Sequence, residues 1–222
     1  MDRHFFDELN SLKEQLLNMG SLAEEMVTIA VRALVEHDVK LLDKICDNED
    51  RVNRYQVDID ENCLKLIALH QPTASDLRFL LGIIKINAEL ERVGDHAVNI
   101  CNGVSLVLEQ AQLKPYVDIP KMVEIVSSMF EDSLHAFVNL DADKARLILL
   151  RDDQVDQLRY KIIQELIDLM TRDPSKVGIA VQLILIANHF EKIADHATNI
   201  AEVVIFVAQG KDVRHHFCDP IS

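Results

Sequence analysis

The sequence predicts an all-α protein made of two tandem, duplicated three-helix bundles with six long helices. Glycine and proline are scarce, at 6 and 5 residues in 222, which is typical of long helices rather than β-structure. Apolar residues recur at steps of three and four, the spacing of one face of an α-helix. A ten-residue segment that begins at Glu91 returns at Glu191 with six identical positions. This offset of 100 residues indicates a duplicated domain and not a short solenoid repeat.

The first half is predicted to form three of these helices. The first runs from about residue 2 to residue 36, and Asp38 is a candidate N-cap for the second. The second ends near His70, because Pro72 disfavours helical backbone at the residue before it. The third runs from about residue 75 to residue 112 and carries the first copy of the repeated segment.

The second half repeats this plan. Apolar positions of the first two helices recur at an offset of 103, and Asp141 matches Asp38. The offset falls to 100 because the loop at Asp173 is three residues shorter than its counterpart at Pro72. The last helix is expected from about Pro174 to Gly210. The predicted units are therefore a bundle over 1–113, a linker at 114–116, a bundle over 118–210 and a poorly ordered tail over 211–222.

Composition restricts the compartment and the partners. A net charge of −14 disfavours nucleic acid as a partner and favours cations or basic surfaces. The chain has four scattered cysteines, Cys46, Cys63, Cys101 and Cys218. They form no C-x-x-C pair, which argues against a thiolate metal site and fits a reducing compartment. The start of the chain lacks the apolar run of a signal peptide, and the apolar stretches near 177–187 and 203–208 are shorter than a membrane span needs. We therefore expect a soluble, cytoplasmic protein.

Each copy of the repeated segment combines an apolar stripe with a pair of carboxylates. The two matching stripes are Ile86, Leu90, Val93, Ala97 and Ile100, and Ile186, Phe190, Ile193, Ala197 and Ile200. At about 100° per residue, Glu91 and Asp95 point away from the first stripe, and Glu191 and Asp195 from the second. Like charges at this spacing cost about 0.2–0.5 kcal/mol in an isolated helix. We expect a cation or a basic partner to compensate.

Carboxylate oxygens are ligands for hard cations, so iron, manganese or magnesium is the expected metal. Two ligands do not make a site, and further carboxylates have to come from neighbouring helices. The helices before the two motif helices offer Glu49, Asp50 and Asn53, and Asp152, Asp153 and Asp156. Asp50 and Asp153 occupy matching places in the repeat and complete the predicted ligand sets, with Glu91 and Asp95 and with Glu191 and Asp195. The alternative is a solvated acidic face without metal.

The chain resembles the PhoU family of phosphate-transport accessory proteins over essentially its whole length. The segment Gln71-Pro72-Thr73-Ala74-Ser75-Asp76-Leu77-Arg78 and the motif copy from Leu90 to Ile100 resemble the first half of that family, and the segment from Phe190 to Glu202 resembles the second. The resemblance implies a fold of two three-helix bundles. It also implies metal clusters at the two Glu-x-x-x-Asp motifs. Glu202 corresponds to Asn102 in the first copy, so we do not expect the two sites to bind metal equally.

The resemblance implies a regulator and not an enzyme. Such a protein would act beside the phosphate ABC transporter and link its ATPase subunit to a membrane sensor histidine kinase. It would hold the phosphate-starvation response off when phosphate is ample. The resemblance further implies a homodimer that associates only peripherally with membrane complexes.

Other interpretations of the repeated segment stay open. A metal-free scaffold would use the same acidic faces for docking. A histidine phosphotransfer module would need an exposed reactive histidine, but His96 and His196 lie on the flank of the apolar stripe, which favours packing histidines with a single hydrogen bond. A di-iron carboxylate enzyme would need Glu-x-x-His on two helices, and no Glu in the chain has His three residues later.

Overall fold

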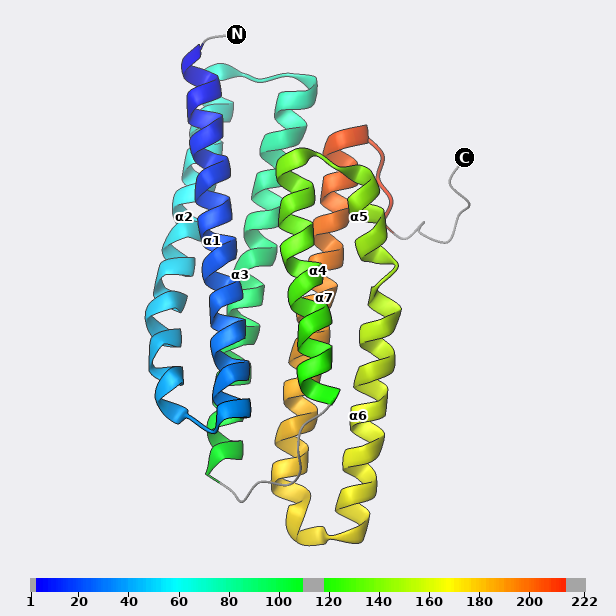
Figure 1. Cartoon of the computed structure of the whole chain (residues 1–222). Coiled ribbons are helices and arrows are strands. Elements are labelled where there is room, and N and C mark those ends of the chain that lie inside the picture. The colour runs from blue at the N-terminus through cyan, green and yellow to red at the C-terminus, as the bar shows by residue number, and fades with distance from the viewer. Residues whose placement is uncertain (1–2, 110–117, 215–222) are drawn as a thin grey trace.

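A computed structural model of the chain describes residues 3–109 and 118–214. The first repeat contains α1 (Arg3–Glu36), the 3-10 turn η1 (Val39–Leu42), α2 (Asp43–His70) and α3 (Ala74–Leu108). The second repeat contains α4 (Asp118–Asn139), α5 (Ala142–Leu149), α6 (Asp152–Arg172), the 3-10 turn η2 (Pro174–Lys176) and α7 (Val177–Gln209). The all-helical fold is confirmed (Figure 1). The linker expected at 114–116 and the end of the tail lie outside the described residues.

Side-chain caps start the helices where the sequence predicts breaks. The Asp38 carboxylate accepts a hydrogen bond from the backbone N–H of Lys40 at 3.0 Å. Its counterpart Asp141 accepts from the backbone N–H groups of Asp143 and Lys144, at 3.1 and 2.9 Å. An aspartate that satisfies free N–H groups in this way stabilises a helix start by about 1 kcal/mol. Both aspartates therefore cap the segment that follows the predicted break: Asp38 caps η1, which leads directly into α2, and Asp141 caps α5.

The second repeat differs from the prediction in one respect. A single helix was expected from Asp141 to about residue 172, and the structure breaks it into α5 and α6 at Leu150 and Arg151. Arg151 donates to the Asp132 carboxylate at 2.9 Å and to the Ile125 carbonyl at 3.4 Å, both on α4. These tertiary contacts hold the chain at the break.

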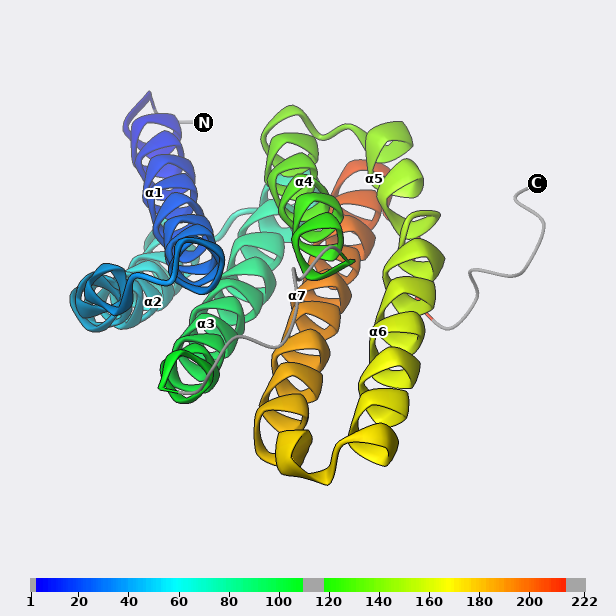
Figure 2. The ribbon, with the colours of Figure 1, turned by 60° about the horizontal axis from the view of Figure 1, so that its bottom comes forward.

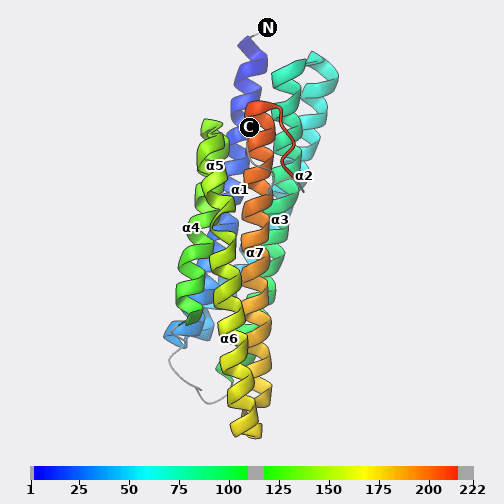
Figure 3. The ribbon, with the colours of Figure 1, turned by 90° about the vertical axis from the view of Figure 1, so that its right-hand side faces the viewer.

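The two motif helices lie side by side at the centre of the molecule. Helices α3 and α7 run antiparallel and make the most extensive helix pair, with α1 and α2 packed on α3, and α4, α5 and α6 packed on α7 (Figures 1 and 2). The long helices follow one common axis (Figure 3). The buried apolar side chains of both repeats form one continuous core. The repeats are therefore joined along the whole α3–α7 contact, which the sequence did not predict.

Two glycines let α3 and α7 approach closely. A Cβ atom on Gly82 would lie 2.5 Å from Val207 Cγ2, and one on Gly103 would lie 3.0 Å from Ile186 Cγ1. Both distances are too short for an ordinary carbon contact, so larger residues would push the helices apart. The two glycines lie toward opposite ends of α3 and thus hold the two repeats together at both ends.

Helix α7 is apolar on several sides. The segment Pro174–Gln209 is long and apolar enough to span a membrane, with a mean hydropathy of 1.3 in its best window, 44% of which is buried. The sequence analysis did not expect any segment to reach this threshold. A helix that packs against α3, α4, α5 and α6 must be apolar on each of those sides, so its central position accounts for the composition.

Candidate functional site

The two copies of the motif meet across an approximate two-fold axis between α3 and α7. His196 of the second copy contacts Glu89 of the first repeat, with 2.7 Å between Nδ1 and Oε2. The equivalent contact, 100 residues away on each side, joins His96 and His189, with 3.1 Å between the two Nδ1 atoms. The rings of His96 and His196 stack on each other with their centroids 5.3 Å apart. Each motif copy thus contributes a histidine to the interface with the other repeat.

Glu89 forms the polar centre of this interface. Burial raises its pKa, but the hydrogen bonds from His196 and Asn199 and the positive charge of Arg92 outweigh burial, so that the net pKa is lowered. Asn199 donates to Glu89 Oε2 at 3.0 Å, and Arg92 pairs with Oε1 at 3.1 Å. The carboxylate therefore stays ionised and holds three partners from both repeats.

The histidines are packing residues. His196 is 9% exposed, which confirms the expectation of a buried, hydrogen-bonded imidazole. Burial, together with the nearby His196, lowers the pKa of His96 to about 4, which keeps this imidazole neutral at physiological pH.

The second motif forms an acidic cluster that contains its own counterion. We name Asp152, Asp156, Glu191 and Asp195 the second acidic cluster. Lys192 Nζ lies 3.1 Å from Glu191 Oε2 and 2.7 Å from Asp195 Oδ2. Burial, and then the charges of Asp195, Asp156 and Glu191, raise the pKa of Asp152 to about 6. The cluster therefore holds more negative charge than Lys192 neutralises.

The first motif lacks this internal counterion. Burial raises the pKa of Glu91, and the charge of Asp95 adds to that effect, while Arg92 lowers it in part. Arg92 occupies the position that matches Lys192 but pairs with Glu89. Within residues 3–109 and 118–214, neither Glu91 nor Asp95 forms an ion pair.

Asp50 and Asp153, the predicted metal ligands from the neighbouring helices, are poorly placed to complete the two motif sites. Asp50 on α2 and Asp153 on α6 are exposed. The α6 residue with the strongest coupling to the second motif is Asp152, and Asp153 contributes least among its acidic neighbours. The structure therefore brings Asp152 to Glu191 and Asp195 in preference to Asp153. The predicted ligand Asp153 is therefore less well placed than Asp152, although Asp153 is the residue that matches Asp50 in the repeat.

The carboxylate oxygens of the two motifs are suitable ligands for a hard cation, but their positions in this structure do not form a metal site. All candidate ligands are carboxylate oxygens, and the second acidic cluster carries excess negative charge. Among the described residues, however, no group of three His, Cys, Asp or Glu side chains is placed to hold one metal ion together. Lys192 instead bridges Glu191 and Asp195. Metal binding would require Lys192 to leave and the carboxylates to turn inward.

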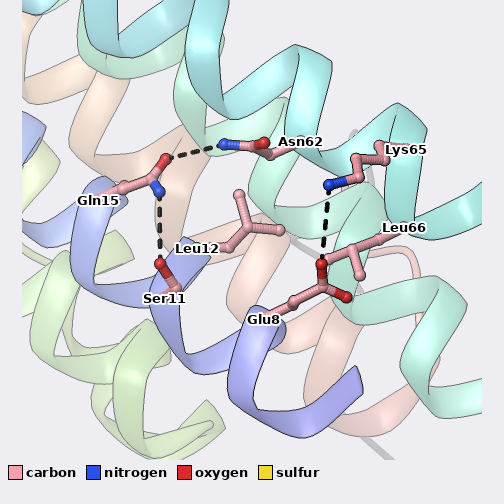
Figure 4. Close-up of a pocket in the computed structure, with 7 residues that line it drawn as sticks. All are labelled: Glu8, Ser11, Leu12, Gln15, Asn62, Lys65 and Leu66. Carbon is pink, nitrogen blue, oxygen red and sulfur yellow. Dashed lines mark hydrogen bonds and ion pairs between the residues drawn. The ribbon is translucent and has the colours of Figure 1, made fainter. Parts of the chain in front are cut away.

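A separate pocket of about 170 Å³ lies between α1 and α2 (Figure 4). Its polar side chains, Glu8, Ser11, Gln15, Asn62 and Lys65, pair with one another. Glu8 also pairs with His70 at 3.2 Å near the end of α2. These contacts fasten the start of α1 to the end of α2 and account for the polar residues there.

Fold and site together define a class: an internally duplicated helical-bundle protein whose two motif helices pack across a pseudo-two-fold axis and display carboxylate pairs. The sequence model of a protein family described as "PhoU domain" matches residues 16–104 and again residues 119–204. The chain therefore belongs to the PhoU family.

Similar proteins agree over nearly the full length. The chain is 40% identical over 210 residues to the phosphate-specific transport system accessory protein PhoU homolog of Aquifex aeolicus (strain VF5), covering 95% of each chain. It is 34% identical to the phosphate-specific transport system accessory protein PhoU of Escherichia coli (strain K12), covering 95% of this chain and 88% of that one. The crystal structure of PhoU from Pseudomonas aeruginosa superposes with a TM-score of 0.90 at 34% identity, over 93% of this chain and 100% of that chain.

Proposed function

We propose that this protein is an accessory regulator of phosphate uptake that represses the phosphate-starvation response. It would link the ATPase subunit of the phosphate ABC transporter to a sensor histidine kinase. The observation that carries the proposal is the near full-length similarity to proteins named phosphate-specific transport system accessory protein, with both copies of the motif present. These relatives are accessory and regulatory proteins and not enzymes.

The surface chemistry supports a role in docking. The net charge of −14 and the two carboxylate pairs favour basic partner surfaces. We propose that the protein works in the cytoplasm, associates with membrane complexes only at their periphery, and forms a homodimer. Sedimentation at several protein concentrations tests the dimer, and a monomer at all of them would contradict it.

We further propose that a hard metal ion binds at each motif. Glu91 and Asp95, with Asp50, would hold it in the first repeat, and Glu191 and Asp195, with Asp152 or Asp153, in the second. A bound cation would supply positive charge where the carboxylates repel one another. The raised pKa values of Glu91 and Asp152 support this proposal in part: burial is their largest cause, and the charges of neighbouring carboxylates, which a cation would offset, add to it.

The metal-free scaffold remains the second candidate, and one contact favours it. Lys192 already lies between Glu191 and Asp195 and could be displaced by a basic group of a protein partner as well as by a metal. A phosphotransfer role is disfavoured, because His196 is buried against Glu89 and His96 is packed between His189 and His196.

A deletion strain tests the main proposal. Loss of the gene should derepress phosphate-scavenging genes in phosphate-rich medium, and the wild-type gene supplied in trans should restore repression. Complementation with the double variant D95N/D195N separates the two candidates. Loss of repression by a folded double variant shows that the acidic motifs act, and elemental analysis of protein purified without chelators then distinguishes metal binding from docking. Unchanged expression in the deletion strain would argue against the assignment.

A further inference from the structure

We propose that Cys46 and Cys101 form a reversible disulfide that ties α2 to the motif helix α3. Cys46 is exposed near the start of α2, and Cys101 is half-buried on α3. This modification site lies outside the carboxylate motifs and does not depend on the proposed function.

The register of the α2–α3 pair brings the two cysteines opposite each other. Asn87 of α3 donates to the Asp60 carboxylate of α2 at 2.9 Å. Fourteen residues separate Asp60 from Cys46, and fourteen separate Asn87 from Cys101. The two helices are antiparallel, so a step of 14 residues back along α2 and 14 residues forward along α3 covers the same distance in the same direction. Because 14 residues make nearly four helical turns, the residues reached, Cys46 and Cys101, again lie on the facing sides of the two helices.

A contact midway lies within one residue of this register, because its α2 partner, Val52, stands eight residues before Asp60. Gly94 lies seven residues beyond Asn87, and a Cβ atom on it would lie 3.3 Å from Val52 Cγ1 of α2. The helices are therefore closely packed one heptad before Cys101. The electrostatics at Cys101 agree with this placement, because burial raises the pKa of its thiol and Cys46 and Asp43 of α2 add to the effect.

The second repeat supplies an independent view of the same contact. The residues that match Cys46 and Cys101 are Leu149 on α5 and Ala201 on α7. Ala201 is fully buried, Leu149 packs against the core, and α5 packs on α7. The matching positions of the second repeat thus lie on two helices that pack together, as α2 and α3 do, but hold Leu149 and Ala201 in place of thiols.

The start of α2 can supply the small movement that bond formation needs. A disulfide requires Cα atoms about 4.4–6.8 Å apart. Cys46 lies in the first turn of α2, where Leu42 and Ile45 are buried in the core. The exposed Cys46 side chain can change its rotamer toward Cys101 without moving these two residues. The buried Cys63, by contrast, is held in the middle of α2, and burial with the nearby Asp60 raises the pKa of its thiol to about 12.

The chemistry is thiol–disulfide exchange with a low-molecular-weight disulfide such as oxidised glutathione. The exposed Cys46 thiolate attacks one sulfur of that disulfide, forms a mixed disulfide and releases one small thiolate. The Cys101 thiolate then attacks Cys46 Sγ, forms the Cys46–Cys101 bond and releases the second small thiolate. The two thiol protons end on the released thiols, so the protein is oxidised by two electrons and the small disulfide is reduced. In a reducing compartment the bond would be transient and would respond to the redox state.

The test is equilibration of the reduced full-length chain with glutathione mixtures of rising oxidised share, followed by acid quenching and non-reducing peptide mapping by mass spectrometry. All proteins carry C218S, because Cys218 lies outside the described residues. We expect the 46–101 linked peptide in the parent protein and in C63S. We expect C101S to stop at the glutathione adduct on Cys46, and C46S to give no linked peptide. The crosslinked monomer should melt several degrees higher than the reduced one, because a loop of about 55 residues is closed in the unfolded chain.

Two results would overturn the disulfide proposal. In one, the parent protein accumulates the glutathione adduct on Cys46 without the Cys46–Cys101 link; in the other, the link joins two chains. Because Cys46 is exposed, C46S is expected to keep its fold, and its circular dichroism checks this.

Discussion

In the second repeat Lys192 lies between Glu191 and Asp195, whereas in the first repeat the matching Arg92 turns away from Glu91 and Asp95 toward Glu89. The same motif on the same kind of helix therefore pairs with its own lysine in one repeat, whereas its carboxylates form no ion pair in the other, among the residues that the structure describes. The difference shows that a repeated carboxylate pair does not imply two equal binding sites. Both copies carry a basic residue after the Glu, but only the first repeat has a second carboxylate, Glu89, that takes this residue away from the motif; the matching residue of the second repeat is His189.

The interface between the repeats is also unequal. On one side of the axis His196 meets Glu89, and on the other side His96 meets His189. The first contact joins a carboxylate to an imidazole, and the second joins two imidazoles.

Removing matched core side chains tests whether the repeats unfold together. Leu90 and Phe190 hold equivalent places and are both fully buried. We expect a loss of about 3–5 kcal/mol in the free energy of unfolding for Phe190→Ala and about 2–5 kcal/mol for Leu90→Ala. Because one core spans both repeats, each variant should show a single urea transition by circular dichroism. A variant that loses half of its helical signal in a separate step would show that the repeats are independent.

Metal binding should stabilise the wild type and should depend on the motifs. At a hundredfold excess over the dissociation constant, one bound ion adds about 2.7 kcal/mol by mass action. Thermal melting with and without iron(II), manganese or magnesium measures this gain. The variant D95N/D195N should lose it and keep its helical content, and each single variant reports one repeat. An equal shift in wild type and double variant would mean that the ion binds elsewhere.

Removing the internal counterion should make the second repeat behave more like the first. Without metal, Lys192→Gln should cost about 1 kcal/mol or less, because the lysine is about half exposed. A divalent cation should stabilise this variant more than the wild type. Melting curves with a magnesium titration check the difference, and Lys161→Gln, which breaks exposed pairs to Asp118 and Glu165, is the matched control. A control that gains as much as Lys192→Gln would assign the effect to net charge alone.

The raised pKa of Asp152 on α6 should make the free energy of unfolding depend on pH. The pKa of Asp152 rises from 3.8 to about 6 on folding, so the folded state holds this proton more tightly than the unfolded chain. The contribution of Asp152 to stability therefore falls as the pH rises from about 4 to about 6. At pH 7 we expect Asp152→Asn to be more stable than wild type by roughly 1 kcal/mol after solvent screening. Chemical denaturation at pH 4 and pH 7 measures the difference, and Asp153→Asn, at an exposed site with the weakest effect on Asp152, should show a smaller one.

Much of the fold follows from patterns within single helices. The stripe residues Ile86, Leu90 and Ile193 are at most 1% exposed, as a stripe of period 3.6 requires. Asp38 and Asp141 start the segments that they were expected to start. Local spacing carries this information because burial on one face and capping of free N–H groups are decided within a few residues.

What the sequence did not predict depends on contacts between helices. The segment around Leu150 contains no glycine or proline, and the break there is held by Arg151 reaching α4. Just after the break, the half-buried Asp152 is coupled to Asp195 and Glu191 of the second motif, whereas its neighbour Asp153 is exposed. The pairing of α3 with α7 is likewise not predicted from the sequence. At the repeat offset of 100 residues, Glu89 of the first repeat corresponds to His189 of the second. Glu89 lies just outside the identical positions, so internal similarity alone gave it no weight.

The pairing of α3 with α7 is that of a symmetric dimer whose two subunits have been fused into one chain. In a dimer of identical subunits every interface position occurs twice, so a Glu89 would face a histidine on both sides of the axis, and a His189 would do the same. Fusion removes that constraint, because each half can change without changing the other. The Glu89–His196 and His96–His189 contacts use this freedom, because matching positions of the two repeats hold a glutamate on one side of the axis and a histidine on the other. Covalent linkage has thus made it possible for two halves of one design to take on different chemistry while sharing a single core.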